Sequence, residues 1–109
     1  MERVCLCFEI RPGTGEEFDR RHADAWPDFL AALGEAGFRN YSLFRRDTTV
    51  IAYGECEPTV AEAFARLSAQ PVAARWGEWF VPEIMPLAVI DGEGVPDRVD
   101  EVWHFEGAA

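Results

Sequence analysis

Lysine is absent from this sequence of 109 residues: all ten basic residues are arginines, and 20 acidic residues outnumber them. The formal net charge at pH 7 is therefore −10. A chain with this charge repels phosphate groups, so we expect it to bind neither nucleic acid nor an anionic membrane surface. The charge balance favours a neutral or cationic small molecule as the ligand.

Long hydrophobic runs are also absent. No apolar stretch approaches the roughly 20 residues that a membrane-spanning helix needs, and the amino terminus lacks the pattern of a secretory signal peptide. The three cysteines, Cys5, Cys7 and Cys56, are an odd number in a chain without an export signal. We therefore expect reduced thiols and a cytoplasmic protein.

Apolar residues are plentiful in spite of the short runs. Hydrophobic residues make up 49% of the sequence and aromatic residues 13%. A chain of this length buries roughly 65% of the surface that its unfolded form exposes. This composition excludes intrinsic disorder and, with no visible linker or repeat, predicts one domain over residues 1–109.

The first third of the sequence predicts a strand and a broken helix. Residues 3–10 are rich in Val, Cys, Leu, Phe and Ile, which favours a strand. Thr14 and Glu17 have the spacing of a capping box, so a helix is expected to begin there. Its apolar residues recur at helical spacing as far as Gly37, a residue typical of a left-handed helix end. Pro27 is expected to kink or split the helix.

The remainder predicts a hairpin, two short helices and a final strand. In order, the expected elements are strands 38–46 and 48–57, helices 60–69 and 72–81, an apolar stretch 87–90, a loop 91–97 and a strand 98–106. Pro82 and Pro86 are expected to end the helical run. This order is βαββαβ, the pattern of an α+β ferredoxin-like sandwich with a four-stranded antiparallel sheet and helices on one face.

Apolar side chains fall on both faces of the predicted strands. They include Cys5, Cys7, Ile51, Tyr53, Trp103 and Phe105. The face without helices therefore needs a cover of its own. A homodimer, with the sheets packed face to face or edge to edge as in a dimeric α+β barrel, would provide it.

The two histidines differ in their predicted surroundings. His22 follows Phe18 by four residues and precedes Phe29 by seven, so it shares the apolar stripe of its helix and points toward the sheet. There it is either a core residue or a general acid or base in a pocket. His104 lies in the last predicted strand, where a surface or packing role is expected.

Motifs for cofactors and metals are missing. Cys5 and Cys7 share one face of a strand, but a zinc site needs two further ligands that no spacing supplies. No phosphate-binding loop, dinucleotide fingerprint or nucleophile elbow occurs. We expect no cofactor and no metal, with a cysteine nucleophile paired with His22 as an alternative.

Aromatic side chains accompany His22 in the predicted elements. They are Trp26, Tyr41, Trp76 and Trp79. One interpretation makes them core anchors. The other makes them a platform for a sugar, because a pyranose ring has an apolar C–H face, and the pairs Asn40-Tyr41 and Arg75-Trp76 add polar groups at its edge.

Five short stretches stand out by their order and spacing. They are Glu16-Glu17-Phe18-x-Arg20-Arg21-His22, Trp26-Pro27, Asn40-Tyr41-Ser42, Arg75-Trp76 and Met85-Pro86. Together they resemble the L-rhamnose mutarotase family over nearly the whole chain. The resemblance implies a ferredoxin-like homodimer that interconverts the α and β anomers of a 6-deoxyhexose without cofactor or metal.

The resemblance also implies roles for individual residues. His22 would be the catalytic proton donor, acting on the ring oxygen, and Tyr41 and Trp76 would contact the sugar. Phe18 stands where the family usually has Tyr, and Gly77 stands where it usually has a second Trp, so both changes bear on sugar selectivity. Further candidates near the sugar are Trp79, Trp26, Arg21 and Asn40.

Two other functions compete with the mutarotase. One is a non-catalytic dimeric module that binds a small ligand, and the other is a cofactor-free oxygenase of the dimeric α+β barrel type. A pocket that holds His22, Tyr41 and Trp76 together would favour the mutarotase. A large apolar cavity without donors for a sugar would favour the oxygenase. The group that complements His22 is either Tyr41 or a bound water.

Overall fold

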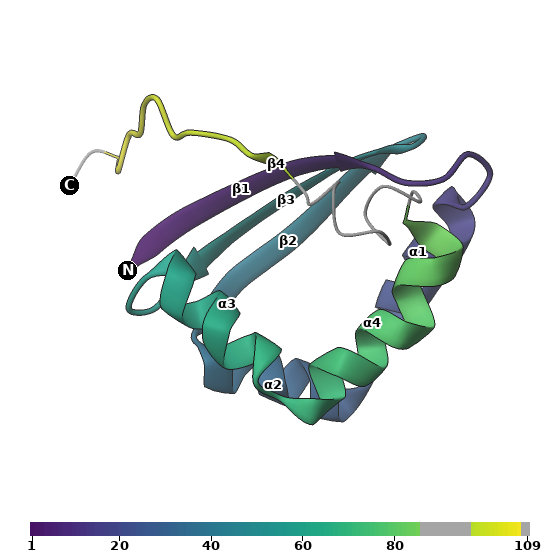
Figure 1. Cartoon of the computed structure of the whole chain (residues 1–109). Coiled ribbons are helices and arrows are strands. Elements are labelled where there is room, and N and C mark those ends of the chain that lie inside the picture. The colour runs from purple at the N-terminus through teal and green to yellow at the C-terminus, as the bar shows by residue number, and fades with distance from the viewer. Residues whose placement is uncertain (86–96, 108–109) are drawn as a thin grey trace.

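The structure, a computed structural model, describes residues 1–85 and 97–107 and has an α+β architecture (Figure 1). Its elements along the chain are β1 (Glu2–Glu9), α1 (Gly15–Ala23), α2 (Pro27–Ala36), β2 (Phe38–Arg46), β3 (Thr49–Cys56), α3 (Val60–Ser68), α4 (Pro71–Ile84) and β4 (Asp97–Arg98). All four helices lie on one side of an antiparallel sheet (Figure 1). The carboxy-terminal segment runs along the other side.

The sheet consists of three long strands and one very short one. The strand order is β2-β3-β1-β4, and every neighbouring pair is antiparallel. β1 and β3 pair along their whole length, from Glu2 opposite Cys56 to Glu9 opposite Thr49. β4 adds two residues to the outer edge of β1. The α+β class and the helices on one face are as predicted.

The final strand predicted over 98–106 is wrong in extent. Only Asp97 and Arg98 form a strand, and pairing with β1 stops after the Val99 N–H donates to the Cys5 carbonyl at 2.8 Å. Residues 99–107 have no regular structure. An alternating pattern specifies a strand only where one face is buried, and the Trp103 side chain is 77% exposed. The apolar stretch 87–90 and residues 91–96 of the expected loop lie outside the described residues.

Proline and glycine divide the first helical region as predicted. α1 ends at Ala23 and α2 begins at Pro27, at a position where the missing N–H of proline costs no helical bond. Gly37 ends α2 with φ of 111°. A Cβ on Gly37 would lie 2.1 Å from the Glu57 carbonyl oxygen, so both the backbone conformation and the space require glycine.

The predicted capping box is wrong. The Thr14 hydroxyl donates to the Arg11 carbonyl at 2.6 Å and makes no hydrogen bond to an amide of α1. Glu17 instead accepts hydrogen bonds from Arg20 and Arg21. Both partners of the box are thus engaged elsewhere, and α1 begins without a side-chain cap.

The prediction that Pro82 ends the second helical region is wrong. α4 continues through Pro82 to Ile84. A proline inside a helix costs about 3 kcal/mol. Burial opposes this cost: Phe80 and Ile84 flank the proline and are buried in the core, and such side chains contribute roughly 1.5–3 kcal/mol each. The Ile84 carbonyl at the helix end accepts from the Arg11 N–H at 2.8 Å.

The core between sheet and helices has two parts. The first cluster comprises Ile10, Phe18, Val50, Trp76, Phe80, Ile84 and Met85. The second comprises Val4, Ala36, Phe38, Cys56, Val60 and Ala63. None of the helices in the described part of the chain is long and apolar enough to cross a membrane.

Candidate functional site

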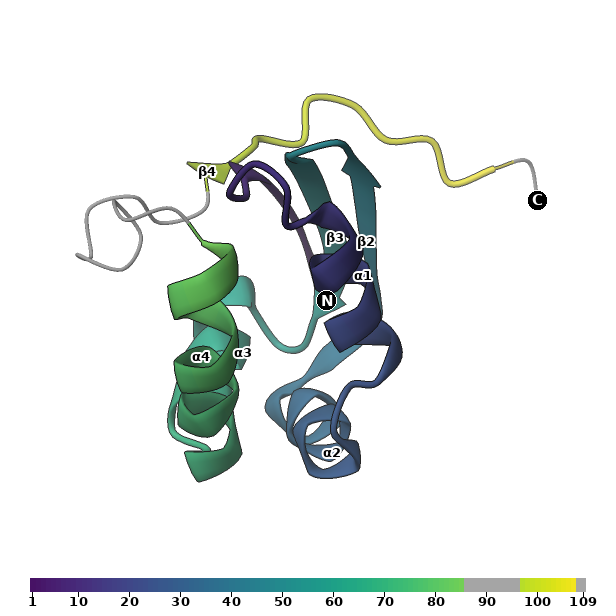
Figure 2. The ribbon, with the colours of Figure 1, turned by 90° about the vertical axis from the view of Figure 1, so that its right-hand side faces the viewer.

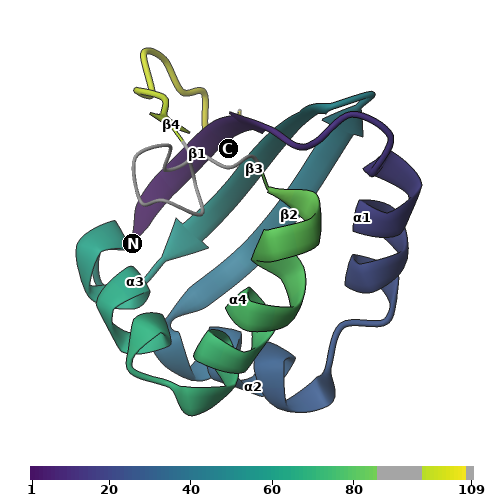
Figure 3. The same cartoon turned by 45° about the vertical axis from the view of Figure 1, so that its right-hand side comes forward.

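A cavity of about 420 Å³ lies on the helical side of the sheet. It is lined by Phe8, Phe18, His22, Phe29, Leu30, Leu33, Phe38, Tyr41, Leu43, Phe64, Leu67, Trp76 and Phe80. All four helices and two strands contribute, and members of both core clusters face it. The cavity therefore forms where the two clusters meet. Figure 3 shows how the helices that contribute to it are arranged on their side of the sheet.

His22 stands in the last turn of α1 and is half-buried, as the helical spacing predicted. Its ring centroid lies 4.4 Å from that of Phe18, 5.2 Å from that of Phe80 and 5.6 Å from that of Trp76. Nδ1 is 2.9 Å from the Phe18 carbonyl oxygen. Because a carbonyl only accepts, Nδ1 carries the proton, and Nε2 of the neutral imidazole presents a lone pair.

Burial lowers the pKa of His22 below its ordinary value of 6.5. The hydrogen bond to Phe18 and the negative charge of Asp19 oppose this shift and only partly offset it. The Asp19 carboxylate is itself paired with Arg45, at 2.6 Å between Oδ2 and Nη2. His22 is therefore neutral at pH 7, in the protonation state of a base.

Tyr41 reaches the cavity because of an irregularity in β2. The register between β2 and β3 shifts between Arg39 and Ser42, and Asn40 adopts a positive φ of 50°. A bulge of this kind changes the face to which a side chain points. The Tyr41 ring packs edge-on against Phe38, with centroids 5.5 Å apart, and burial raises the pKa of its hydroxyl.

Gly54 makes room for Tyr41, a role that the sequence did not suggest. A Cβ at Gly54 would lie 2.4 Å from Cδ2 of Tyr41, a distance at which no side chain fits. Gly54 lies opposite Val4 of β1, in the middle of the sheet. The glycine could have been singled out only with the register of three strands in hand.

Trp76 forms part of the cavity wall and is 9% exposed. Phe29 stacks on its indole, with centroids 4.4 Å apart and planes 4° from parallel. Phe80 lies one helical turn further along α4, at 5.7 Å. Trp76 is thus held in place by neighbours that also line the cavity.

The sequence singled out nine site candidates, and four of them meet at this cavity: Phe18, His22, Tyr41 and Trp76. Phe18 is buried in its wall with no hydroxyl to offer. The lining residues that sequence reasoning missed are apolar. Phe29 and Leu33 share the apolar spacing of α2, which could have revealed them as core-facing, whereas Leu43 and Phe64 come from elements whose placement no local pattern indicates.

The other five candidates are not among the residues that line the cavity. The rings of Trp26 and Trp79 pack on one another, with centroids 5.1 Å apart, and each also packs on the Trp76 ring. Asn40 is exposed and donates from Nδ2 to Oε1 of Glu55 at 2.8 Å. A Cβ at Gly77 would meet no atom within 4 Å. Arg21 is buried between α1 and α4.

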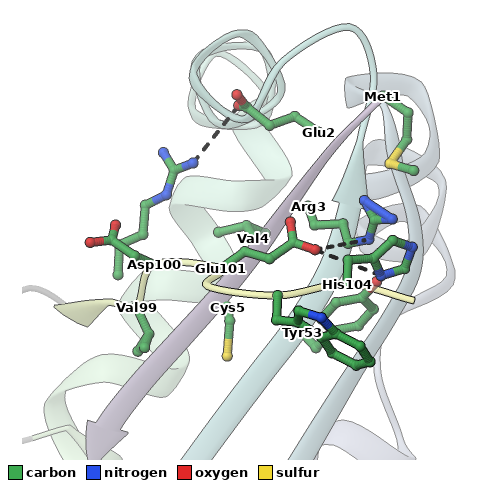
Figure 4. A pocket seen from close by; sticks show the side chains of 12 residues that line it. Met1, Glu2, Arg3, Val4, Cys5, Tyr53, Val99, Asp100, Glu101 and His104 are labelled. Atoms are coloured by element: carbon green, nitrogen blue, oxygen red, sulfur yellow. Dashed lines mark ion pairs between the residues drawn. The ribbon is translucent and has the colours of Figure 1, made fainter. Parts of the chain in front are cut away.

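A second cavity, of about 570 Å³, lies on the opposite side of the sheet between β1 and the carboxy-terminal segment (Figure 4). Glu101 lies at its centre, with Oε1 at 3.7 Å from Arg3 Nε and at 3.7 Å from His104 Nδ1. The His104 side chain is 40% exposed, in keeping with the surface role expected for it. This cavity contains none of the site candidates from the sequence.

The thiols of Cys5, Cys7 and Cys56 form no disulfide, and only Cys56 is buried. Among residues 1–85 and 97–107, no three side chains of His, Cys, Asp or Glu are grouped so that they could hold a metal ion. The chemistry of the first cavity therefore rests on an imidazole, a phenol and an indole within apolar walls.

The fold and the first cavity together define a class: small α+β proteins in which helices close one face of an antiparallel sheet over a histidine-bearing aromatic pocket. Residues 3–105 match the family model described as L-rhamnose mutarotase, and the chain belongs to that family.

Individual relatives and a solved structure agree with this assignment. The chain is 30% identical over 106 residues to the L-rhamnose mutarotase of Sinorhizobium fredii, covering 96% of this chain and 99% of that protein. It is 27% identical to the L-rhamnose mutarotase of Phocaeicola vulgatus, covering 97% and 100%. The crystal structure of an L-rhamnose mutarotase from Formosa agariphila superposes with a TM-score of 0.79 at 19% identity, over 97% of this chain and 100% of that one. Neither the binding module nor the oxygenase is favoured by these findings.

Proposed function

We propose that this protein interconverts the α and β anomers of L-rhamnose, or of a closely related 6-deoxyhexose, by acid–base catalysis at His22. The observation that carries the proposal is the meeting of His22, Tyr41 and Trp76 in one cavity of a chain from this family. No other residues that line the cavity carry a titratable side chain. His22 and Tyr41 are therefore the groups that can exchange protons with a bound hemiacetal.

The reaction opens and recloses the sugar ring. A base removes the proton of the anomeric hydroxyl, the bond between C1 and the ring oxygen breaks, and the ring oxygen gains a proton. The resulting aldehyde rotates about the C1–C2 bond, and the steps then reverse on its other face. Positioned acid–base groups typically contribute about 10² to 10⁴-fold to such a reaction.

The hydrogen bond from Nδ1 of His22 to the Phe18 carbonyl leaves Nε2 as the ring nitrogen that can exchange a proton with the sugar. Nε2 has a free lone pair in the neutral ring, so it accepts the proton of the anomeric hydroxyl when the sugar opens. The same imidazolium returns the proton to the oxygen on C1 when the ring closes, so we assign His22 to the anomeric oxygen and not to the ring oxygen expected from the sequence. The Tyr41 hydroxyl or a water supplies the proton to the ring oxygen.

The apolar walls support a 6-deoxyhexose over an aldohexose with a C6 hydroxyl. Ten of the lining residues are Phe or Leu. A methyl group at C6 gains from contact with such a wall, whereas a buried hydroxyl without a partner costs about 1–3 kcal/mol. The catalytic efficiency is therefore expected to be higher for L-rhamnose than for L-mannose, which differs from it only at C6.

Anomer exchange followed by NMR tests this function. The parent protein should accelerate exchange of L-rhamnose, His22→Ala should fall to the spontaneous rate, and His104→Ala should match the parent. His104 is the matched control, because it is the other histidine of the chain and lies on the opposite side of the sheet. A His22→Ala protein that exchanges anomers as fast as the parent refutes the assignment.

We further propose that the protein works as a homodimer of the α+β barrel type in a reducing, cytoplasmic compartment. Exposed apolar side chains on the uncovered face of the sheet support the dimer: Phe44 is 60% and Ile51 43% exposed, and they are direct cross-strand neighbours. The three unpaired thiols suit a reducing compartment. Sedimentation analysis of the parent and of Phe44→Glu tests the dimer, which the added charge should dissociate.

A further inference from the structure

The guanidinium of Arg21 is buried beside the cavity, outside its lining. Arg21 is 4% exposed and is the one buried charged residue among residues 1–85 and 98–107. Nε donates to Oε1 of Glu17 at 2.7 Å, Nη1 to the Trp79 carbonyl at 2.7 Å, and Nη2 to Oε2 of Glu83 at 2.7 Å. The guanidinium carbon also lies 4.6 Å from the centroid of the Trp79 ring. All three nitrogens are thus bonded, as burial of a charge requires.

Arg21 and His22 hold the same face of α4. The α4 residues that they contact are spaced at i, i+3, i+4 and i+7: Trp76, Trp79, Phe80 and Glu83. The His22 ring packs on Trp76 and Phe80. Arg21 donates hydrogen bonds to the Trp79 carbonyl and the Glu83 carboxylate. Residues with this spacing lie on one side of a helix. Two consecutive residues of α1 therefore interlock with successive positions along one side of α4.

The ribbons of α1 and α4 stand apart and face one another, so side chains make the junction between them (Figure 2). α1 has only nine residues and no side-chain cap at its start. A helix this short is marginal by itself and takes its position from tertiary contacts. Among the contacts between α1 and α4, the hydrogen bonds of Arg21 are directional, whereas the ring contacts of His22 and Phe18 permit sliding.

We propose that Arg21 is a positioning residue that fixes the last turn of α1 against α4 and so holds the His22 imidazole at the aromatic wall of the cavity. The inference rests on the proposed function, because Arg21 itself exchanges no proton with the sugar. A misplacement of a catalytic group by about 1 Å can reduce a rate by about 100-fold.

A matched pair of variants tests this role. Arg21→Met removes the charge and every donor but retains much of the side-chain volume. Arg20→Met is the control: Arg20 also bonds Glu17, but it is exposed, and its partners Glu17 and Asp24 belong to α1 and its end. With L-rhamnose at saturation, we expect the exchange rate constant to fall by about 10 to 100-fold in Arg21→Met and to stay at the parent value in Arg20→Met.

An NMR titration of His22 separates positioning from simple stabilisation. The groups packed on the imidazole are the uncharged rings of Phe18, Trp76 and Phe80, with Asp19 as the charged neighbour on α1 and Tyr41 across the cavity. If Arg21→Met releases α1, the imidazole gains water and its pKa rises toward the ordinary value. If Arg21 contributed only to stability, the variant would unfold at a lower temperature. Well below that temperature, the pKa of His22 and the exchange rate would both equal those of the parent.

The outcomes are distinguishable. A folded Arg21→Met protein with the parent rate and the parent His22 titration overturns the proposal. If this variant does not fold, Arg21→Lys replaces it, since lysine keeps the charge but lacks the planar fork, and the same two readouts decide. If the parent itself exchanges no anomers, the proposed function fails, while the His22 titration of the variants still decides the role of Arg21.

Discussion

The two sides of the sheet carry similar apolar side chains but use them differently. On the helical side, Phe18 and Phe80 are buried, and they line a cavity in which an imidazole is kept neutral. On the other side, Phe44 and Ile51 are exposed, and His104 stands beside a carboxylate near the surface. The two histidines therefore differ in what surrounds them: aromatic rings enclose His22, whereas His104 is 40% exposed.

The largest expected contrast between the two sides concerns stability. Phe80→Ala should lower the free energy of unfolding by about 3–5 kcal/mol, because it empties a position in the core. Phe44→Ala removes a side chain of the same type from the exposed face and should cost less than about 1 kcal/mol in a dissociated monomer. Urea unfolding of both variants at equal, low protein concentration measures the difference. Equal losses would show that the two faces are equally well packed.

A smaller contrast concerns two glycines. Gly54→Val places a side chain where Tyr41 lies and should lower stability by about 1–3 kcal/mol while reducing anomer exchange. Gly77→Ala adds a methyl group in open space on α4 and should raise stability by about 0.5–1 kcal/mol. Thermal unfolding and the exchange assay measure both effects. A Gly54→Val protein with full activity would mean that Tyr41 is not needed in its present position.

The smallest expected effect is on pH dependence. The lowered pKa of His22 means that the folded protein binds fewer protons than the unfolded chain near pH 6.5, so this group's contribution to stability is complete above that pH. It is lost as the pH falls through the folded-state pKa, and the exchange rate should fall over the same range as Nε2 becomes protonated. In His22→Ala, neither the free energy of unfolding nor the residual exchange rate should show the decrease that His22 causes in this pH range. A rate that rises as the pH falls below 6 would contradict a base in the opening step.

Local patterns were sufficient where the physics is local. Pro27 divides two helices because proline cannot supply an interior N–H, and Gly37 ends the second because of its positive φ. His22 faces the sheet because it lies one turn from Phe18. Such features depend on neighbours within a few residues, and the sequence contains those neighbours.

Two failures occurred where distant residues decide: α4 passes through Pro82 because Phe80 and Ile84 on either side of it are buried, and the alternating segment after Arg98 lacks a second layer to cover it. The capping box failed for a local reason, because the Thr14 hydroxyl bonds the Arg11 carbonyl three residues before it. At the site, the pairs Asn40-Tyr41 and Arg75-Trp76 suggested a sugar platform and the resemblance assigned Tyr41 and Trp76 to it, but no local pattern showed that they would meet at His22. The role of Gly54 could not be predicted, because the space that it leaves for Tyr41 exists only once β2 pairs with β3.

The protonation of one ring nitrogen decides whether His22 can act as the base, and ¹⁵N NMR of the protein with labelled histidines observes it directly. At pH 7, His22 should show a protonated Nδ1 and an unprotonated Nε2, and L-rhamnose should shift the Nε2 signal of His22 while leaving His104 unchanged. A protonated Nε2 on His22 in the free protein, or a sugar that moves only the signals of His104, would contradict the assignment of Nε2 as the base.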